Sequence, residues 1–176
     1  MAKLPIIRLK SRESARLRFG APWVFSNEIV MDAAAKALLP GSEVLLAGSD
    51  GTVLGAGYFN ARSLISLRLL AKQSCTFDVT FFAERIRAAL ALREALYDKP
   101  FYHLVHAEGD DLPGLVIDRF ADTLSVQITI AGMERLTDTT HHGGICMLAR
   151  EPALRILMFS MHEEARSEER RVGKEC

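Results

Sequence analysis

The sequence of 176 residues predicts an α+β protein, in which a small barrel of short strands precedes one helix and an antiparallel sheet. Residues 1–72 alternate strand-like runs with glycine turns, a pattern typical of a small barrel. Residues 78–96 repeat apolar side chains at helical spacing, and residues 101–130 return to strand-like runs. A helix followed by strands indicates an α+β unit.

The first part is expected to hold several strands and one short helix. The Asp50-Gly51 pair lies between two strand-like runs and predicts a hairpin. Residues 12–18 predict a helical turn with basic residues near its end, as the helix dipole favours, and Gly20 ends it. Strands are expected over residues 5–9, 23–25, 43–47, 52–59 and 64–70.

The second part begins after a polar linker at residues 72–76. Asp78 is placed to cap a helix that continues to Leu96, where Asp98 and Pro100 stop it. Residues 101–105 start the sheet, and Ala121-Asp122 turns one strand into the next.

Two motifs carry a resemblance to a known family. One is Gly20-Ala-Pro-Trp-Val-Phe-Ser-Asn-Glu-Ile29, and the other is the acidic turn and hairpin of residues 106–127, which includes Glu108-Gly-Asp-Asp-Leu-Pro-Gly-Leu-Val-Ile-Asp-Arg-Phe120. The amino-acid sequences of these motifs and their order along the chain resemble the large-subunit ribosomal RNA methyltransferase I family. Its members are S-adenosylmethionine-dependent RNA cytosine-5 methyltransferases. The resemblance runs from about Pro5 to about Leu136.

The resemblance implies three domains in a full-length member: a PUA pseudo-barrel, a central α+β domain and a Rossmann-like catalytic domain. On this reading residues 1–72 are the PUA-type RNA-binding domain, and residues 73–137 are a truncated central domain. The catalytic domain is expected to be absent. The chain alone is therefore predicted to be inactive and to bind no cofactor, although the family implies S-adenosylmethionine for the full-length protein.

Residues 138–176 lack the periodicity of the preceding parts. The last eleven residues, Arg166–Cys176, resemble the translation of a common sequencing adapter. We therefore expect residues 138–176 to be frame-shifted or adapter-derived and to have no packed place in the native fold. A natural charged tail is the alternative.

Charge is distributed unevenly along a chain whose formal net charge is zero. Residues 1–72 contain ten Lys or Arg against five Asp or Glu, whereas residues 73–140 contain six against eleven. A basic part joined to an acidic part predicts an anionic partner for the first, with ribosomal RNA favoured by the resemblance. Ordinary surface variation is the alternative.

The predicted RNA-binding residues combine cations that neutralise phosphates with neighbours that contact bases or riboses. Trp23, Tyr58 and Asn60 are available for the second task, although Trp23 taken alone is expected to pack in the core. Arg12 and Arg16 are expected to be exposed, so that replacing them leaves the fold intact. The predicted set is Lys10, Arg12, Arg16, Arg18, Trp23, Asn60, Arg62 and Arg68.

An acidic group, Glu108, Asp110, Asp111 and Asp118, could bind Mg²⁺ or act in acid–base catalysis, but its spacing fits no EF-hand loop and tight turns also recruit aspartate. We favour the structural interpretation. His103 and His106 are expected on opposite faces of a strand. The three cysteines form no CxxC pair, so no metal is expected.

Cofactor binding is not predicted, because no strand runs into a glycine-rich loop that opens a helix. Gly55-Ala-Gly57 lies inside the β-rich part, and no cysteine stands in the family's nucleophile motif. The favoured hypothesis is an RNA-binding fragment of a 23S rRNA cytosine-5 methyltransferase; the alternative is a stand-alone PUA-type RNA-binding module. Without a leader or a membrane-length apolar run, the chain is predicted to be cytoplasmic.

Overall fold

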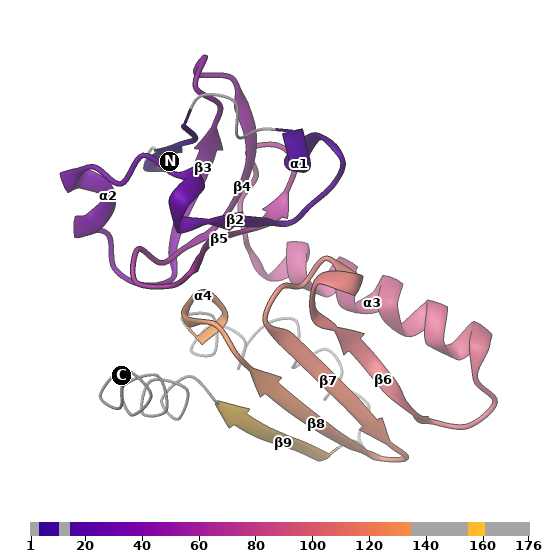
Figure 1. Cartoon of the computed structure of the whole chain (residues 1–176). Helices are drawn as coiled ribbons and strands as arrows, with labels where there is room; N and C mark the ends of the chain where they lie inside the picture. The colour runs from indigo at the N-terminus through magenta and orange to yellow at the C-terminus, as the bar shows by residue number, and fades with distance from the viewer. Residues whose placement is uncertain (1–3, 11–14, 135–154, 161–176) are drawn as a thin grey trace, which may run out of the picture. The chain divides into compact units, whose positions relative to one another are not determined.

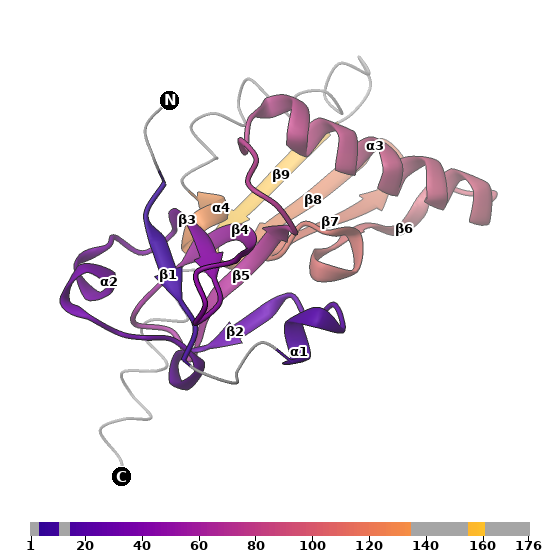
Figure 2. The ribbon, with the colours of Figure 1, turned by 90° about the horizontal axis from the view of Figure 1, so that it is seen from above.

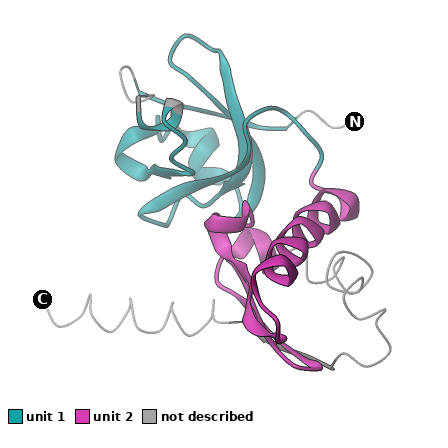
Figure 3. Cartoon of the chain, turned by 90° about the vertical axis from the view of Figure 1, so that its right-hand side faces the viewer, with its two compact units in different colours: residues 1–76 teal, residues 77–176 magenta. Residues whose placement is uncertain are grey.

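The computed structural model describes residues 4–10, 15–134 and 155–160, and it divides the chain into two units, residues 1–76 and 77–176 (Figures 1 and 3). The boundary lies four residues after the expected end of the first domain. Each unit contains its own sheet. None of the helices in these described ranges is long and apolar enough to cross a membrane.

Unit 1 is a curled five-stranded sheet in the order β1-β3-β4-β5-β2 (Figure 1). Strand β1 is parallel to β3, and the remaining pairs are antiparallel. The elements are β1 (Ile6–Arg8), α1 (Ala15–Arg18), β2 (Trp23–Phe25), the 3-10 helix η1 (Ser26–Glu28), α2 (Ala33–Ala37), β3 (Ser42–Ala47), β4 (Val53–Phe59) and β5 (Ile65–Ala71).

The segments that follow the two edge strands of this sheet pair with each other. Leu9 and Ile29 form an antiparallel bridge, and both side chains are buried. The Lys10 amide donates to the Glu28 carbonyl at 2.8 Å, and the Val30 amide donates to the Arg8 carbonyl at 2.9 Å. The expected small barrel is confirmed as a sheet that closes on itself.

Alternation along the strands fills the interior of unit 1. Val24 on β2, Val44 on β3 and Leu67 on β5 point inward and are fully or almost fully buried. The predicted hairpin is also present: Gly51 has a φ of 84°, and the Asp50 carboxylate accepts the Thr52 amide at 3.0 Å.

Unit 2 is a helix packed on a four-stranded sheet in the order β6-β7-β8-β9 (Figure 2). Asp78 caps α3 as predicted, because its carboxylate accepts the Phe81 amide at 2.9 Å. The elements are α3 (Val79–Leu96), β6 (Phe101–His106), the 3-10 helix η2 (Ala107–Asp110), β7 (Leu115–Phe120), β8 (Thr123–Ile128), α4 (Ala131–Glu134) and β9 (Arg155–Ser160).

Strand β9 corrects two expectations. It pairs with β8 in parallel, from Thr123 opposite Arg155 to Ile128 opposite Ser160, so the sheet is mixed and not purely antiparallel. Residues 138–176 were expected to have no packed place, and for Arg155–Ser160 that expectation is wrong. The apolar run at residues 156–159 is typical of a β-strand, and this strand forms one edge of the described sheet. The adapter-like residues 166–176 lie outside the described ranges.

Among the described glycines, Gly57 leaves the least room for a side chain. A Cβ atom at this position would stand 2.0 Å from the Arg68 carbonyl oxygen on β5. We expect Gly57→Ala to lower the free energy of unfolding by about 2 kcal/mol or more, because strand backbone must move. Urea denaturation checks this. Gly109→Ala is the matched control, since the nearest atom to its Cβ would be 3.8 Å away; equal stability of the two variants would contradict the prediction.

Candidate nucleic-acid interface

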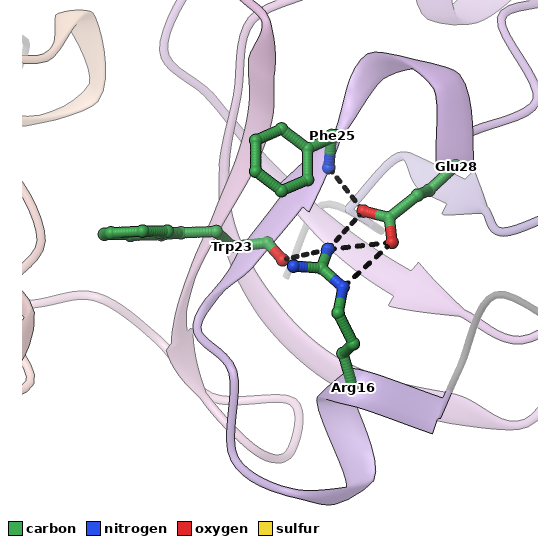
Figure 4. A network of polar contacts seen from close by, with 4 residues as sticks. All are labelled: Arg16, Trp23, Phe25 and Glu28. Carbon is green, nitrogen blue, oxygen red and sulfur yellow. Dashed lines mark hydrogen bonds and ion pairs between the residues drawn. The ribbon is translucent and has the colours of Figure 1, made fainter.

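A buried carboxylate organises the predicted basic surface of unit 1. The Glu28 side chain is 9% exposed. Nη2 of the Arg16 guanidinium donates to both of its carboxylate oxygens, at 2.8 Å to Oε1 and 2.7 Å to Oε2 (Figure 4). The Phe25 amide also donates to Oε2 at 2.7 Å. The guanidinium carbon lies 4.9 Å from the centroid of the Phe25 ring. These contacts fasten α1 to β2 and η1.

Arg16 therefore differs from the exposed, dispensable cation that the sequence predicts. Its side chain is half exposed, but its charge faces a carboxylate that water barely reaches. Without the guanidinium, the Phe25 amide would be the one donor that the described residues place against the Glu28 carboxylate. Because of this pairing we expect replacement of Arg16 to lower the stability of the fold, contrary to the expectation from sequence, and its contact with RNA stays a prediction.

Trp23 lies on the outer side of the sheet, and the expectation that it packs in the core is wrong. Its side chain is 38% exposed, whereas the next residue, Val24, points inward and is 1% exposed. Trp23 stands opposite Arg68 on β5, with the guanidinium carbon 5.9 Å from the ring centroid. Figure 4 shows the indole directed away from the Arg16–Glu28 pair. Successive side chains on a strand point to opposite faces of the sheet, so Trp23 faces outward because Val24 faces the interior.

Lys10, Asn60 and Arg62 lie near the other end of β2. The Lys10 ammonium donates to the Asn27 carbonyl at 2.8 Å. Asn60 and Arg62 belong to the loop between β4 and β5, where the Asn60 carboxamide accepts the Arg62 amide at 3.0 Å. The Ser26 amide holds this loop through the Leu64 carbonyl, at 2.9 Å.

The structure thus brings six predicted residues together along β2 and the adjoining η1. Arg16, Trp23 and Arg68 lie along β2, and Lys10, Asn60 and Arg62 lie around η1. Of the other two, Arg12 lies outside the described residues, and for Arg18 only the backbone is described. Tyr58 is 4% exposed and therefore unavailable to a base.

Sequence reasoning missed two residues of this surface. Glu28 passes for an ordinary turn residue, and only its place three positions after Phe25, the spacing of a capping contact, could have drawn attention to it. Phe19 is 92% exposed, directly after α1. A phenylalanine beside the helix-ending Gly20 is the pattern that could have indicated it.

The acidic group of unit 2 is tied into the fold. Asp110 receives a bidentate contact from Arg93 on α3, at 2.6 Å and 2.8 Å, and also accepts the His106 amide at 2.6 Å. Asp118 pairs with His103 on the neighbouring strand. No group of three or more His, Cys, Asp or Glu among the described residues is arranged to hold a metal ion. These contacts favour the structural interpretation.

The two histidines of β6 share one face of the sheet, contrary to expectation. Their ring centroids are 5.9 Å apart, and the rings are stacked at 30°. The cause is a β-bulge: His103 pairs with Asp118 and Val105 with Ile117, so one extra residue, Leu104, shifts the alternation.

The Gly55-Ala-Gly57 pattern lies in the middle of β4 and opens no helix. The strand continues into the loop that leads to β5. This pattern therefore lacks the strand–loop–helix geometry that cradles a dinucleotide-like cofactor.

The paired charge at Arg16 yields a stability prediction. Arg16→Ala should lower the free energy of unfolding by roughly 1–3 kcal/mol, because a nearly buried carboxylate loses its bidentate partner. Lys10→Ala, an exposed cation on the same surface, should cost under about 0.5 kcal/mol. Urea denaturation of both variants measures the difference, and a fully stable Arg16→Ala protein would show that Glu28 needs no counter-charge.

Comparison with known proteins relates the first part of the chain to a domain family and most of the chain to named proteins. Residues 7–72 match the PUA-like domain family. Proteins called ribosomal RNA large subunit methyltransferase I are similar over about three quarters of the chain. The one from Shewanella denitrificans is 38% identical over 137 residues, covering 76% of this chain and 34% of its own, and the one from Escherichia coli is 32% identical over 133 residues, covering 73% and 33%.

Solved structures agree on the fold. A candidate SAM-dependent methyltransferase from Streptococcus mutans superposes with a TM-score of 0.74 at 16% identity, over 89% of this chain and 41% of that one. A candidate methyltransferase solved with SAH gives a TM-score of 0.72 at 18% identity, over 91% and 40%.

The chain spans about a third of the length of the curated relatives it matches. Identity of 32–38% over 133–137 residues, together with a PUA-like domain in unit 1, supports the assignment of this chain to the ribosomal RNA large subunit methyltransferase I family.

Proposed function

We propose that this chain is the RNA-binding part of an S-adenosylmethionine-dependent 23S rRNA cytosine-5 methyltransferase, working in the cytoplasm. The observation that carries the proposal is the cluster of cations and Trp23 along β2 and η1, within a PUA-like domain. The methyl transfer itself would belong to the two thirds of the relatives' length that this chain does not match.

The charge of unit 1 supports an RNA partner. Residues 1–72 have twice as many basic as acidic residues, and one of the five acidic side chains, Glu28, is buried against Arg16. Because this pair removes one charge of each sign, the basic excess of five charges is carried by the remaining residues. Lys10 and Arg62 are both exposed and lie on either side of η1. Counterion release from phosphates would drive binding at such a surface.

A stand-alone RNA-binding module with no catalytic role is the second candidate. The division into two units favours it, since each has its own sheet and its own buried apolar residues. The DNA beyond the codon for Leu136 discriminates between the two: a downstream glycine-rich cofactor motif in any frame supports the methyltransferase, and its absence supports the module. Equilibrium dialysis adds a second check, because the chain alone is expected to show no saturable S-adenosylmethionine binding.

RNA affinity is expected to reside in Lys10 and Arg62. Each phosphate contact contributes about −0.7 to the slope of log affinity against log salt for a single strand. Lys10→Ala combined with Arg62→Ala should therefore flatten the slope by about 1.4 and weaken binding at low salt. Fluorescence anisotropy with labelled single-stranded RNA, titrated at several salt concentrations, measures both quantities.

Lys36→Ala is the matched control for this experiment. Lys36 is an exposed cation of the same unit on α2, which lies on the opposite side of unit 1 from α1 (Figures 1 and 2). Its removal should leave the slope unchanged. If Lys36→Ala changed the salt slope as much as the double variant does, RNA affinity would depend on net charge alone. If the double variant left both slope and affinity unchanged, the assigned surface would be refuted.

A further inference from the structure

The sheet of unit 2 has one face that α3 does not cover. Alternation separates the two faces: Leu115, Ile117 and Val126 are buried, and on the same side Arg119 reaches Glu94 of α3 at 3.8 Å. The intervening residues therefore point away from the helix, and we call their side of the sheet the open face. Its members are Phe101, His103 and His106 on β6, Val116, Asp118 and Phe120 on β7, and Thr123, Ser125 and Gln127 on β8.

Strand register arranges these nine side chains in three rows. Phe101 stands opposite Phe120, which stands opposite Thr123. The second row is His103, Asp118 and Ser125, and the third is His106, Val116 and Gln127. One edge of the grid is thus made of rings, and the edge on β8 is made of hydrogen-bonding groups.

The rings are presented to solvent. Phe101 is 60% exposed and Phe120 is 54% exposed, although each is large and apolar. The His103 side chain is 71% exposed, and His106 is exposed as well. The bulge at Leu104 keeps His106 on this face, since an unbroken strand would turn it toward α3.

We propose that the open face binds single-stranded RNA, with unpaired bases stacked on Phe101, Phe120 and the histidine pair, an inference that rests on the proposed function. Phe101 and His103 are same-face neighbours on β6, about 6.6 Å apart along the strand, so each can be covered by a base. A solvent-facing sheet whose aromatics stack bases is a general solution to single-strand recognition. Thr123, Ser125 and Gln127 supply donors and acceptors for the edges of splayed bases.

The nine side chains of this face carry little charge, although unit 2 is acidic. Asp118 is the only carboxylate of the grid, and His103 is paired with it. Asp110 is held by Arg93, and Glu94 lies beside Arg119 on the other side of the sheet. The grid also holds no lysine or arginine, so its contribution to binding should depend on ring contacts and not on counterion release.

The test uses the whole chain and a labelled single-stranded RNA of mixed sequence. Phe101→Ala with Phe120→Ala should weaken binding at least about fivefold while leaving the salt slope unchanged. Phe101→Leu with Phe120→Leu keeps apolar side chains but removes the π faces, and should weaken binding to a similar degree. Phe101→Trp with Phe120→Trp should bind as well as the wild type or better.

Leu92→Ala is the matched control, because Leu92 is 52% exposed on α3 and lies away from the open face. It should leave affinity unchanged. Full-duplex RNA is the control ligand: its bases are already stacked, so the phenylalanine variants should bind it as the wild type does.

Four results would overturn the inference. Unchanged affinity in both the alanine and the leucine variants would remove the open face from RNA binding; if Lys10→Ala with Arg62→Ala still flattens the slope, the proposed function survives. Loss in the alanine variant alone would indicate apolar packing without base stacking. Self-association of the wild type that the alanine variant abolishes, with RNA affinity unchanged, would assign the face to protein contact. A wild-type chain that binds no RNA would refute the proposed function as well.

Discussion

Glu28 carries a carboxylate into the interior of unit 1, and the parts of that unit are arranged around it. Its side chain accepts the Arg16 guanidinium and the Phe25 amide, while its backbone carbonyl accepts the Lys10 amide where the sheet closes. One residue thus joins the segment after β1, helix α1 and strand β2. A carboxylate this poorly hydrated requires partners, so the position of α1 follows from the burial of Glu28. The surface that carries Lys10 and Trp23 depends on the same arrangement.

Local features of the sequence were enough to predict the local structure. Asp78 before a run of apolar residues at helical spacing predicted α3 and its cap, and Asp50-Gly51 predicted the hairpin between β3 and β4. These predictions succeed because the physical cause lies within a few residues of the effect. The barrel was also predictable, since several short strands with glycine turns can bury an apolar face in few other ways.

Long-range features could not be predicted in this way. Nothing in the sequence near Arg16 indicates that its partner is Glu28, twelve residues away. Nor does the local sequence indicate that Val24 faces the interior and Trp23 the outside. The bulge at Leu104 moved His106 to the face of His103, because a period of two fails after one inserted residue. Strand β9 was missed since the residues around it lack a pattern, and its parallel pairing with β8 is a property of the sheet.

The strand order of unit 1 sets how the chain can fold as it leaves the ribosome. Strand β2, at residues 23–25, pairs only with β5, and β1 pairs with β3 in parallel, so neither of the first two strands has a partner among its neighbours in sequence. Strand β1 must wait until β3 (Ser42–Ala47) has emerged, and β2 must wait until residue 71 or so has emerged, after the β3–β4 hairpin can form. Such delayed, non-local pairing is slow, because a long loop must close before its contacts stabilise it. The newborn chain therefore passes through a period in which Ile7, Val24 and Ile29 are synthesised but unburied, a period that favours capture by chaperones.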